Sequence, residues 1–231
     1  MMRRAHLTAC VTLLLTAGMA VAQPHAGEWV NYRDAYRAMV VFDKYGGPKN
    51  LLQHALQVQP REKGALGQGV QLLMKGKTVQ AGLALDALGR TTLPLLKAAY
   101  DENAVLSPSR ALGGFAVKPR VSLALRPDGT YDLADLRAAC EQALGFARYA
   151  DNSARGSQCA GVRLVFAKDG PAPGVRVRAG GAEQLLPTAR GAAFAGDADD
   201  DFPVVTYRFG AQAAGQVVTY HAPLAIVPLF E

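Results

Sequence analysis

The chain has 231 residues, of which 50% are hydrophobic and only 19% charged, with 24 glycines and 13 prolines. This composition excludes a disordered chain, a collagen-like repeat and a coiled coil, and the length suits one large domain or two small ones. The 25 lysines and arginines exceed the 19 acidic residues. They form no basic run, so we expect no nucleic-acid partner.

The first 22 residues have the pattern of a secretory signal peptide. Arg3 and Arg4 precede an apolar stretch, and small residues at positions 20 and 22 frame a cleavage site near Ala22. A membrane anchor is the alternative, but the stretch is short for a bilayer span and threonines interrupt it. No later segment is long and apolar enough to span a membrane. We therefore expect a periplasmic or secreted mature protein.

Cleavage would leave two cysteines, Cys140 and Cys159. In an exported chain such a pair favours a disulfide over a buried free thiol or a catalytic thiol. The closed loop of about 20 residues would stabilise the fold by roughly 3 kcal/mol in the chain-entropy model. No local motif supports thiol catalysis, so we predict the disulfide.

Two helices are indicated by caps and by apolar residues at helical spacing. Asn31 caps the first, which Gly46, Gly47 and Pro48 end. Asp132 caps the second, whose apolar face includes Cys140.

Segments that alternate apolar and polar side chains predict half-buried strands of antiparallel sheets. These strands are expected at 52–59, 70–75, 78–85, 120–126, 162–166, 175–177, 204–209, 217–220 and 225–229. The segment Pro127-Asp128-Gly129 predicts a turn.

A faint internal repeat accompanies this order of elements. A gapless shift of 92 residues aligns residues 69–72 with 161–164, and Gly82 with Gly174. The fold class expected is α+β, with two sandwich-like halves that each combine a helix with an antiparallel sheet, and with an internal duplication as a hypothesis. The expected organisation is a signal peptide over 1–22, a linker over 23–30, a first half over 31–126 and a second half over 127–231.

Catalytic motifs are absent from the sequence. His25, His54 and His221 lack partners at zinc-ligand spacing, and no serine lies in a nucleophile elbow. For His54, on the apolar side of a strand, we expect a packed, hydrogen-bonded imidazole.

The acidic loop with Asp197, Asp199 and Asp201 resembles the oxygen-rich ligand sets of calcium sites. It lacks the glycine and the bidentate glutamate of an EF-hand. The alternative is a solvated acidic turn before the following strand. Calcium is the single cofactor that the sequence suggests.

Arginines on the polar sides of strands form the second candidate surface. Arg163, Arg176 and Arg178 lie in the second half, and Arg120 and Arg126 in the first. Such a stripe could dock an anionic polymer or the carboxylates of another envelope protein. The alternative is the solvated face of a sheet.

These features favour an exported periplasmic protein that acts as a binding or scaffolding module of the cell envelope rather than as an enzyme. An envelope hydrolase with a dispersed active site and a calcium-dependent binding module are the competing hypotheses. A deep cavity with convergent polar groups would favour the hydrolase, and an open groove would favour binding.

Overall fold

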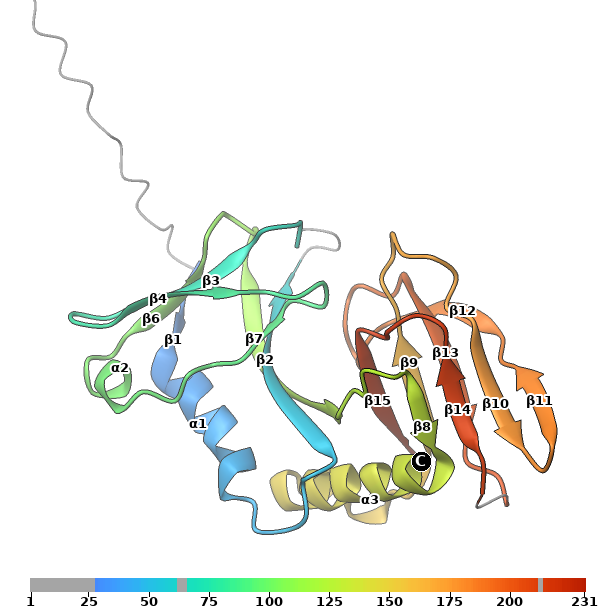
Figure 1. Ribbon diagram of the computed structural model, residues 1–231. Helices are drawn as coiled ribbons and strands as arrows, with labels where there is room; N and C mark the ends of the chain where they lie inside the picture. The colour runs from blue at the N-terminus through green and yellow to red at the C-terminus, as the bar shows by residue number, and fades with distance from the viewer. Residues whose placement is uncertain (1–27, 62–65, 212–213) are drawn as a thin grey trace, which may run out of the picture.

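The computed structural model describes residues 28–61, 66–211 and 214–231 (Figure 1). The signal peptide predicted over 1–22 and His25 lie outside the described residues. Within the described ranges, no helix is long and apolar enough to cross a membrane.

Antiparallel strands in three sheets dominate the structure, which confirms the prediction of sandwich-like antiparallel sheets. The first sheet has the order β1-β6-β3-β4, formed by Val30–Asn31, Val105–Pro108, Gln71–Lys75 and Gln80–Ala84. The second has the order β8-β14-β10-β11, formed by Thr130–Asp132, Gln216–Thr219, Val175–Ala179 and Ala182–Leu185. The third has the order β5-β2-β7-β15-β9-β13-β12, formed by Arg90–Thr91, Leu52–Pro60, Phe115–Leu123, Ala225–Phe230, Cys159–Val165, Phe202–Arg208 and Thr188–Gly191.

Few helices accompany the sheets. They are α1 (Tyr32–Lys44), α2 (Lys97–Asp101), α3 (Leu133–Ala150) and the 3-10 helix η1 (Asn152–Gly156). Asn31 caps α1 by accepting a hydrogen bond from the backbone N–H of Arg33, as predicted. Asp132 occupies the cap position of α3, but its carboxylate accepts a hydrogen bond from the Gln216 amide instead of from the helix.

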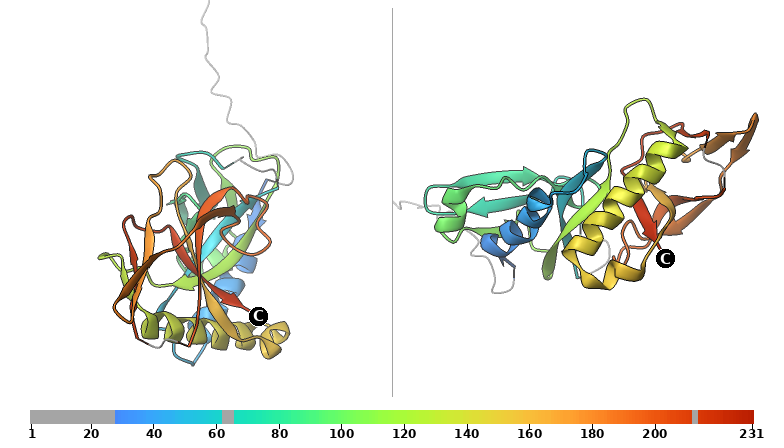
Figure 2. Two further views of the ribbon diagram at one scale, coloured as in Figure 1. Left: turned by 90° about the vertical axis from the view of Figure 1, so that its right-hand side faces the viewer. Right: turned by 90° about the horizontal axis from the view of Figure 1, so that it is seen from below.

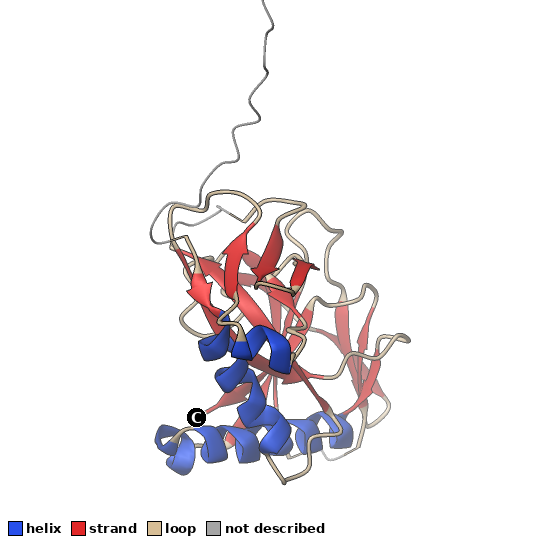
Figure 3. Ribbon diagram, turned by 90° about the vertical axis from the view of Figure 1, so that its left-hand side faces the viewer, coloured by secondary structure: helices blue, strands red, loops and turns tan. Residues whose placement is uncertain are grey.

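Both four-stranded sheets cover the same face of the seven-stranded sheet. Leu56 on β2 is buried against the first small sheet, and Ile226 on β15 against the second. The two halves of the large sheet meet where Leu123 on β7 pairs with Ile226. Helices α1 and α3 lie on one side of the molecule, facing the viewer when it is seen from below (Figure 2) and gathered at one end in Figure 3.

The two small sheets share one strand order. Each begins with the short strand that precedes a helix, β1 before α1 and β8 before α3, and each ends in an edge strand that is paired on one side, β4 or β11. The strand that follows each helix, β2 or β9, pairs with the last strand of its half, β7 or β15. The chain passes from one half to the other between β7 and β8.

The gapless shift of 92 residues does not relate equivalent strands. Gly82 lies within β4, whose counterpart by strand order is β11, whereas Gly174 precedes β10 and has a positive φ of 56°. The predicted equivalence of Gly82 and Gly174 is therefore wrong. Alternating strands resemble one another at any even offset, so the shift matched β3 to β9 by pattern alone.

The strand expected over 120–126 begins and ends earlier, as β7 at Phe115–Leu123. Pro119 lies inside it, and a proline is tolerated in a strand only where no ladder hydrogen bond needs its N–H. Strand β7 has β2 on one side and β15 on the other, but β15 pairs with it only at Leu123. The side of Pro119 that faces away from β2 therefore has no partner strand in the sheet, and the condition is met. After the predicted turn, Gly129 takes a positive φ of 66°.

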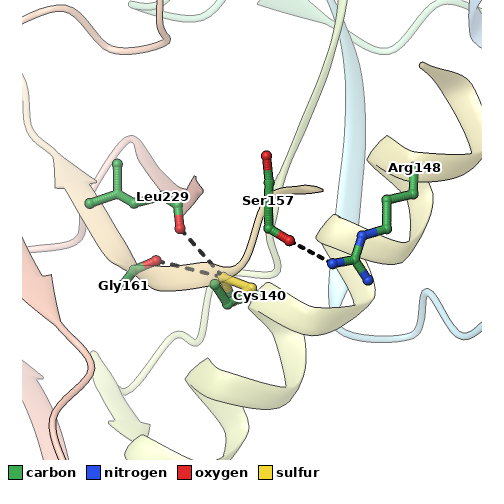
Figure 4. Close-up of a disulfide and its surroundings, with 6 residues drawn as sticks. Cys140, Arg148, Ser157, Gly161 and Leu229 are labelled. Atoms are coloured by element: carbon green, nitrogen blue, oxygen red, sulfur yellow. Dashed lines mark hydrogen bonds between the residues drawn. A yellow bond between two sulfur atoms is a disulfide. The ribbon is translucent and has the colours of Figure 1, made fainter. Parts of the chain in front are cut away.

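The predicted disulfide between Cys140 and Cys159 is present and joins α3 to β9 (Figure 4). The two Cα atoms are 6.0 Å apart, within the range that a disulfide requires. Cys140 is fully buried, and its Sγ lies 3.7 Å from the carbonyl oxygen of Gly161. In the connection between them, Arg148 donates a hydrogen bond to the Ser157 carbonyl at 2.5 Å.

His54 lies between the two helices, on β2. Its ring stacks on Phe42 of α1 at 4.6 Å between centroids, with Phe146 of α3 at 6.5 Å. The expected packing is present, but within the described ranges the buried Nε2 has no hydrogen-bond partner. Burial lowers the pKa of His54 to about 4, and the nearby charge of Asp43 opposes this effect.

We expect acid to destabilise the protein through His54. Above pH 6.5 the imidazole is neutral in both states; below it the unfolded chain binds a proton that the native site rejects down to about pH 4. The free energy of unfolding should therefore fall by about 2 kcal/mol between pH 6.5 and pH 4 for this half-buried ring. Below pH 4 this loss should stay constant.

The measurement is denaturant unfolding at several pH values. His54→Phe keeps an aromatic ring and should remove this part of the pH dependence, whereas His221→Gln, at an exposed histidine, should preserve it. A His54→Phe protein with the wild-type pH profile would contradict this assignment.

Candidate functional site

A cavity of about 650 Å³ lies between the two halves of the chain. Its walls come from β2, from the connections that follow β2 and β4, from the turn after β9 and from the loop before β13. The lining residues are Gln57 to Pro60, Leu66 to Gly69, Leu85 to Leu88, Ala167 to Gly170, Asp197 to Asp199 and Phe202.

Curvature of the seven-stranded sheet brings these segments together. At one end of the sheet, Arg90 on β5 donates a hydrogen bond at 2.6 Å to the carbonyl of Leu224, just before β15. The neighbouring Leu88 enters a buried cluster with Phe194 and Phe202 of the second half. Apolar packing between the halves thus forms one wall of the cavity.

The Asp197 carboxylate forms the polar floor of the cavity. It belongs to the second half, yet it accepts hydrogen bonds from Gln57, Gln59 and Arg120 of the first half. The Arg120 Nε also donates to the Gln57 side-chain oxygen at 2.7 Å, and its guanidinium lies 4.8 Å from the centroid of the Phe194 ring.

This ion pair is shielded from water. The side chain of Asp197 is 5% exposed and that of Arg120 is 16% exposed. Burial lowers the pKa of Arg120, while the adjacent Asp197 charge opposes that change. An isolated charge at this depth would cost several kcal/mol, so each partner requires the other.

A second ion pair lies at the cavity wall. The Lys168 ammonium contacts both oxygens of Asp199 at 2.6 and 2.7 Å, and it lies 4.6 Å from the centroid of the Phe202 ring. Both side chains are about one-third exposed, so they remain accessible to a ligand.

The three aspartates of the calcium hypothesis have separate cationic partners. Asp197 binds Arg120, Asp199 binds Lys168, and Asp201 lies 3.8 Å from Arg190. Among the described residues, no group of three potential metal ligands gathers in one place. Calcium binding at this loop stays a prediction.

The predicted basic stripe does not form one surface, because its arginines are in different sheets. Arg163 lies on β9 of the large sheet, whereas Arg176 and Arg178 lie on β10 of a small sheet. Arg120 pairs with Asp197, and Arg126 pairs with acidic neighbours beside the turn.

Sequence reasoning missed Gln57, Gln59 and Lys168 as site residues. Alternation placed the two glutamines on the polar side of β2, which is correct, but it could not show that the Asp197 loop covers them. Three glutamines alternating along one strand, at 53, 57 and 59, were the available signal.

The described cavity lining is chemically simple. It contains amides, aspartates and one lysine, and none of its residues is a histidine, serine, cysteine or tyrosine. His221 is exposed and is not among the lining residues. Comparison with protein-family models, with curated proteins and with solved structures gave no match for the chain.

We expect Asp197→Ala to destabilise the protein by about 3–5 kcal/mol, because it leaves Arg120 buried without a counter-charge. The double variant Asp197→Leu with Arg120→Met should recover most of that loss, since it removes both charges. Urea unfolding of the three proteins measures the difference. Substitutions of surface residues usually change the free energy of unfolding by less than about 1 kcal/mol. A change of that size in Asp197→Ala would contradict a buried pair.

Proposed function

We propose that the protein is exported and acts as a binding protein, with the cavity between its halves as the ligand site. The supporting observation is a hollow lined by both halves, with a fixed polar floor and apolar walls. Small-molecule sites favour such junctions and combine apolar surface with a few placed polar groups.

The ligand we propose is a small molecule with an apolar body and a cationic group. Leu66 and Leu85, which are partly exposed, offer apolar contacts, and four aspartates line the cavity against one lysine. Three of these aspartates have basic partners; within the described ranges Asp169 makes no ion pair. An amine is the chemical group that this excess of carboxylate would favour.

Binding is proposed in preference to hydrolysis because of what the lining offers. Nucleophilic catalysis needs a nucleophile within reach of a base that is held by a third group. The described lining offers amide side chains and four carboxylates, three of which already hold basic partners. These groups can orient a ligand by hydrogen bonding without reacting with it.

Three fluorescent probes of different charge test the cavity. We expect the cationic dansylcadaverine to bind with increased emission, and the anionic anilinonaphthalene sulfonate to bind at least tenfold more weakly. N-phenyl-1-naphthylamine, which is neutral, should lie between them. Tighter binding of the anionic probe would contradict the proposed ligand class.

Matched variants locate the binding. Ala198→Trp adds a bulky ring to the cavity lining and should abolish binding of dansylcadaverine, whereas Ala150→Trp, at the exposed end of α3, should not. Asp169→Asn should weaken binding by about threefold, as expected for a partly exposed ion pair. Glu141→Gln on α3 is its control. Unchanged binding in Ala198→Trp would exclude the cavity as the site.

The proposed export has its own test. The disulfide is typical of proteins that fold in an oxidising compartment, which supports an N-terminal signal peptide. Mass spectrometry of the exported protein should find a chain that begins at Gln23. A mature protein that retains residues 1–22 would contradict the cleavage.

We further infer that the two halves arose by internal duplication. The shared strand order of the small sheets, each starting before a helix, supports this inference. Superposition of α1 on α3 should then bring β2 onto β9 and β3 onto β10. Strands that diverge after the helices are superposed would contradict a common origin.

A further inference from the structure

The outer edge of the second small sheet has unpaired backbone groups. Strand β11 follows β10 after a tight turn at Gly180 and Gly181, and it pairs with β10 on one side only (Figure 1). The Leu186 N–H donates to the Val175 carbonyl of β10 at 2.9 Å. Because hydrogen-bonding direction alternates along a strand, the N–H and C=O groups of Glu183 and Leu185 point away from β10.

This edge is unusually open. All four residues of β11 are exposed, and Leu185 has an exposed fraction of 61%. Natural proteins protect edge strands with prolines, bulges or covering loops, because free edges pair with other chains. Here the first such residue is Pro187, which lies beyond β11 and leaves the Glu183 and Leu185 groups free.

Side chains beside this edge combine apolar anchors with an excess of positive charge. Leu185, Arg176 and Val218 are direct neighbours across the strands and share the outer face of the sheet. Tyr220, which is 55% exposed, lies beside them with its ring centroid 5.2 Å from the Arg176 guanidinium. Aromatic residues and arginines of this kind are enriched in protein–protein contacts.

One carboxylate serves two arginines at this edge. Glu183 accepts hydrogen bonds from Arg176 at 2.7 Å and from Arg178 at 3.3 Å. The other carboxylate on this face, Asp132, lies on β8 at the far edge of the sheet and accepts from Gln216. Among the described residues of this edge, two arginines therefore share one carboxylate, which leaves one positive charge in excess close to the free backbone groups.

We propose that β11 docks an extended, acidic segment of another protein, which adds to the sheet as a further strand. Backbone hydrogen bonds to Glu183 and Leu185 supply the pairing, as in other cases of strand addition. Leu185 and Tyr220 supply apolar contact, and a carboxylate of the added strand pairs with the arginines. The surface shares no residue with the cavity lining, so it is independent of the ligand site proposed above.

Two synthetic peptides test this surface on the intact, disulfide-bonded protein. One alternates valine with glutamate and the other alternates valine with lysine. NMR-detected hydrogen exchange should show the Glu183 and Leu185 amides at least tenfold slower with the glutamate peptide. The lysine peptide should leave them unchanged. The Gln184 amide, which already faces β10, serves as an internal reference.

Variants separate the backbone from the side chains. Leu185→Pro removes an outward N–H and no hydrogen bond to β10, so the fold should persist while affinity for the glutamate peptide falls at least tenfold. Leu185→Ala keeps the N–H and should lose less. Arg176→Gln combined with Arg178→Gln should abolish the preference for glutamate over lysine.

Three results would overturn the proposal. The first is equal binding of the two peptides, and the second is wild-type affinity in Leu185→Pro. The third is protection of the Glu183 and Leu185 amides in the protein alone, together with a dimer in analytical ultracentrifugation, because a second copy of the chain would then occupy the edge.

Discussion

The buried pair between Asp197 and Arg120 constrains how the two halves fit together. A carboxylate that is 5% exposed must have a counter-charge, and here the cation comes from a strand of the other half. The same loop carries Phe194 into a cluster with Leu88, so the polar and apolar contacts between the halves depend on one segment. With the continuous seven-stranded sheet, this makes the halves interdependent rather than separate modules.

The position of the cavity follows from that constraint. The Asp197 loop crosses the face of the large sheet that the small sheets leave open, and it reaches only part of β2. The uncovered part of β2 and the connections around it remain as the cavity. Gln57 and Gln59 of β2 both line this cavity, and the side-chain amides of both donate hydrogen bonds to the Asp197 carboxylate.

Local patterns predicted the elements whose signals are contained in a few neighbouring residues. The alternation through Leu52 to Gln59 gave β2 and its buried side, and Asn31 marked the start of α1, because both depend on local backbone geometry. The five-residue helix α2 and short strands such as β6 were not predicted, since tertiary contacts rather than their own sequences stabilise them. Cys140 and Cys159 could be paired because they are the two cysteines that lie outside the predicted signal peptide.

The cavity could not be predicted, because its partners are far apart in the chain. Asp197 is separated by 77 residues from Arg120 and by 140 from Gln57, and nothing in the acidic loop specifies either partner. A run of aspartates is equally compatible with a metal site, a solvated turn or a buried ion pair. Only the arrangement of the strands decides between these possibilities.

The shared strand order of the two small sheets makes their differences informative. Both end in an edge strand that is paired on one side, but β4 has no charged side chain and contains Gly82 at its centre, where a glycine weakens strand pairing. Strand β11 instead has Leu185 and Glu183, with Arg176 and Arg178 on the adjacent strand. Open sheet edges in general risk unwanted pairing with other chains. Of the two edges compared, β4 and β11, the β11 edge has the features suited to a partner. This asymmetry fits a surface that serves recognition better than it fits an unavoidable end of a sheet.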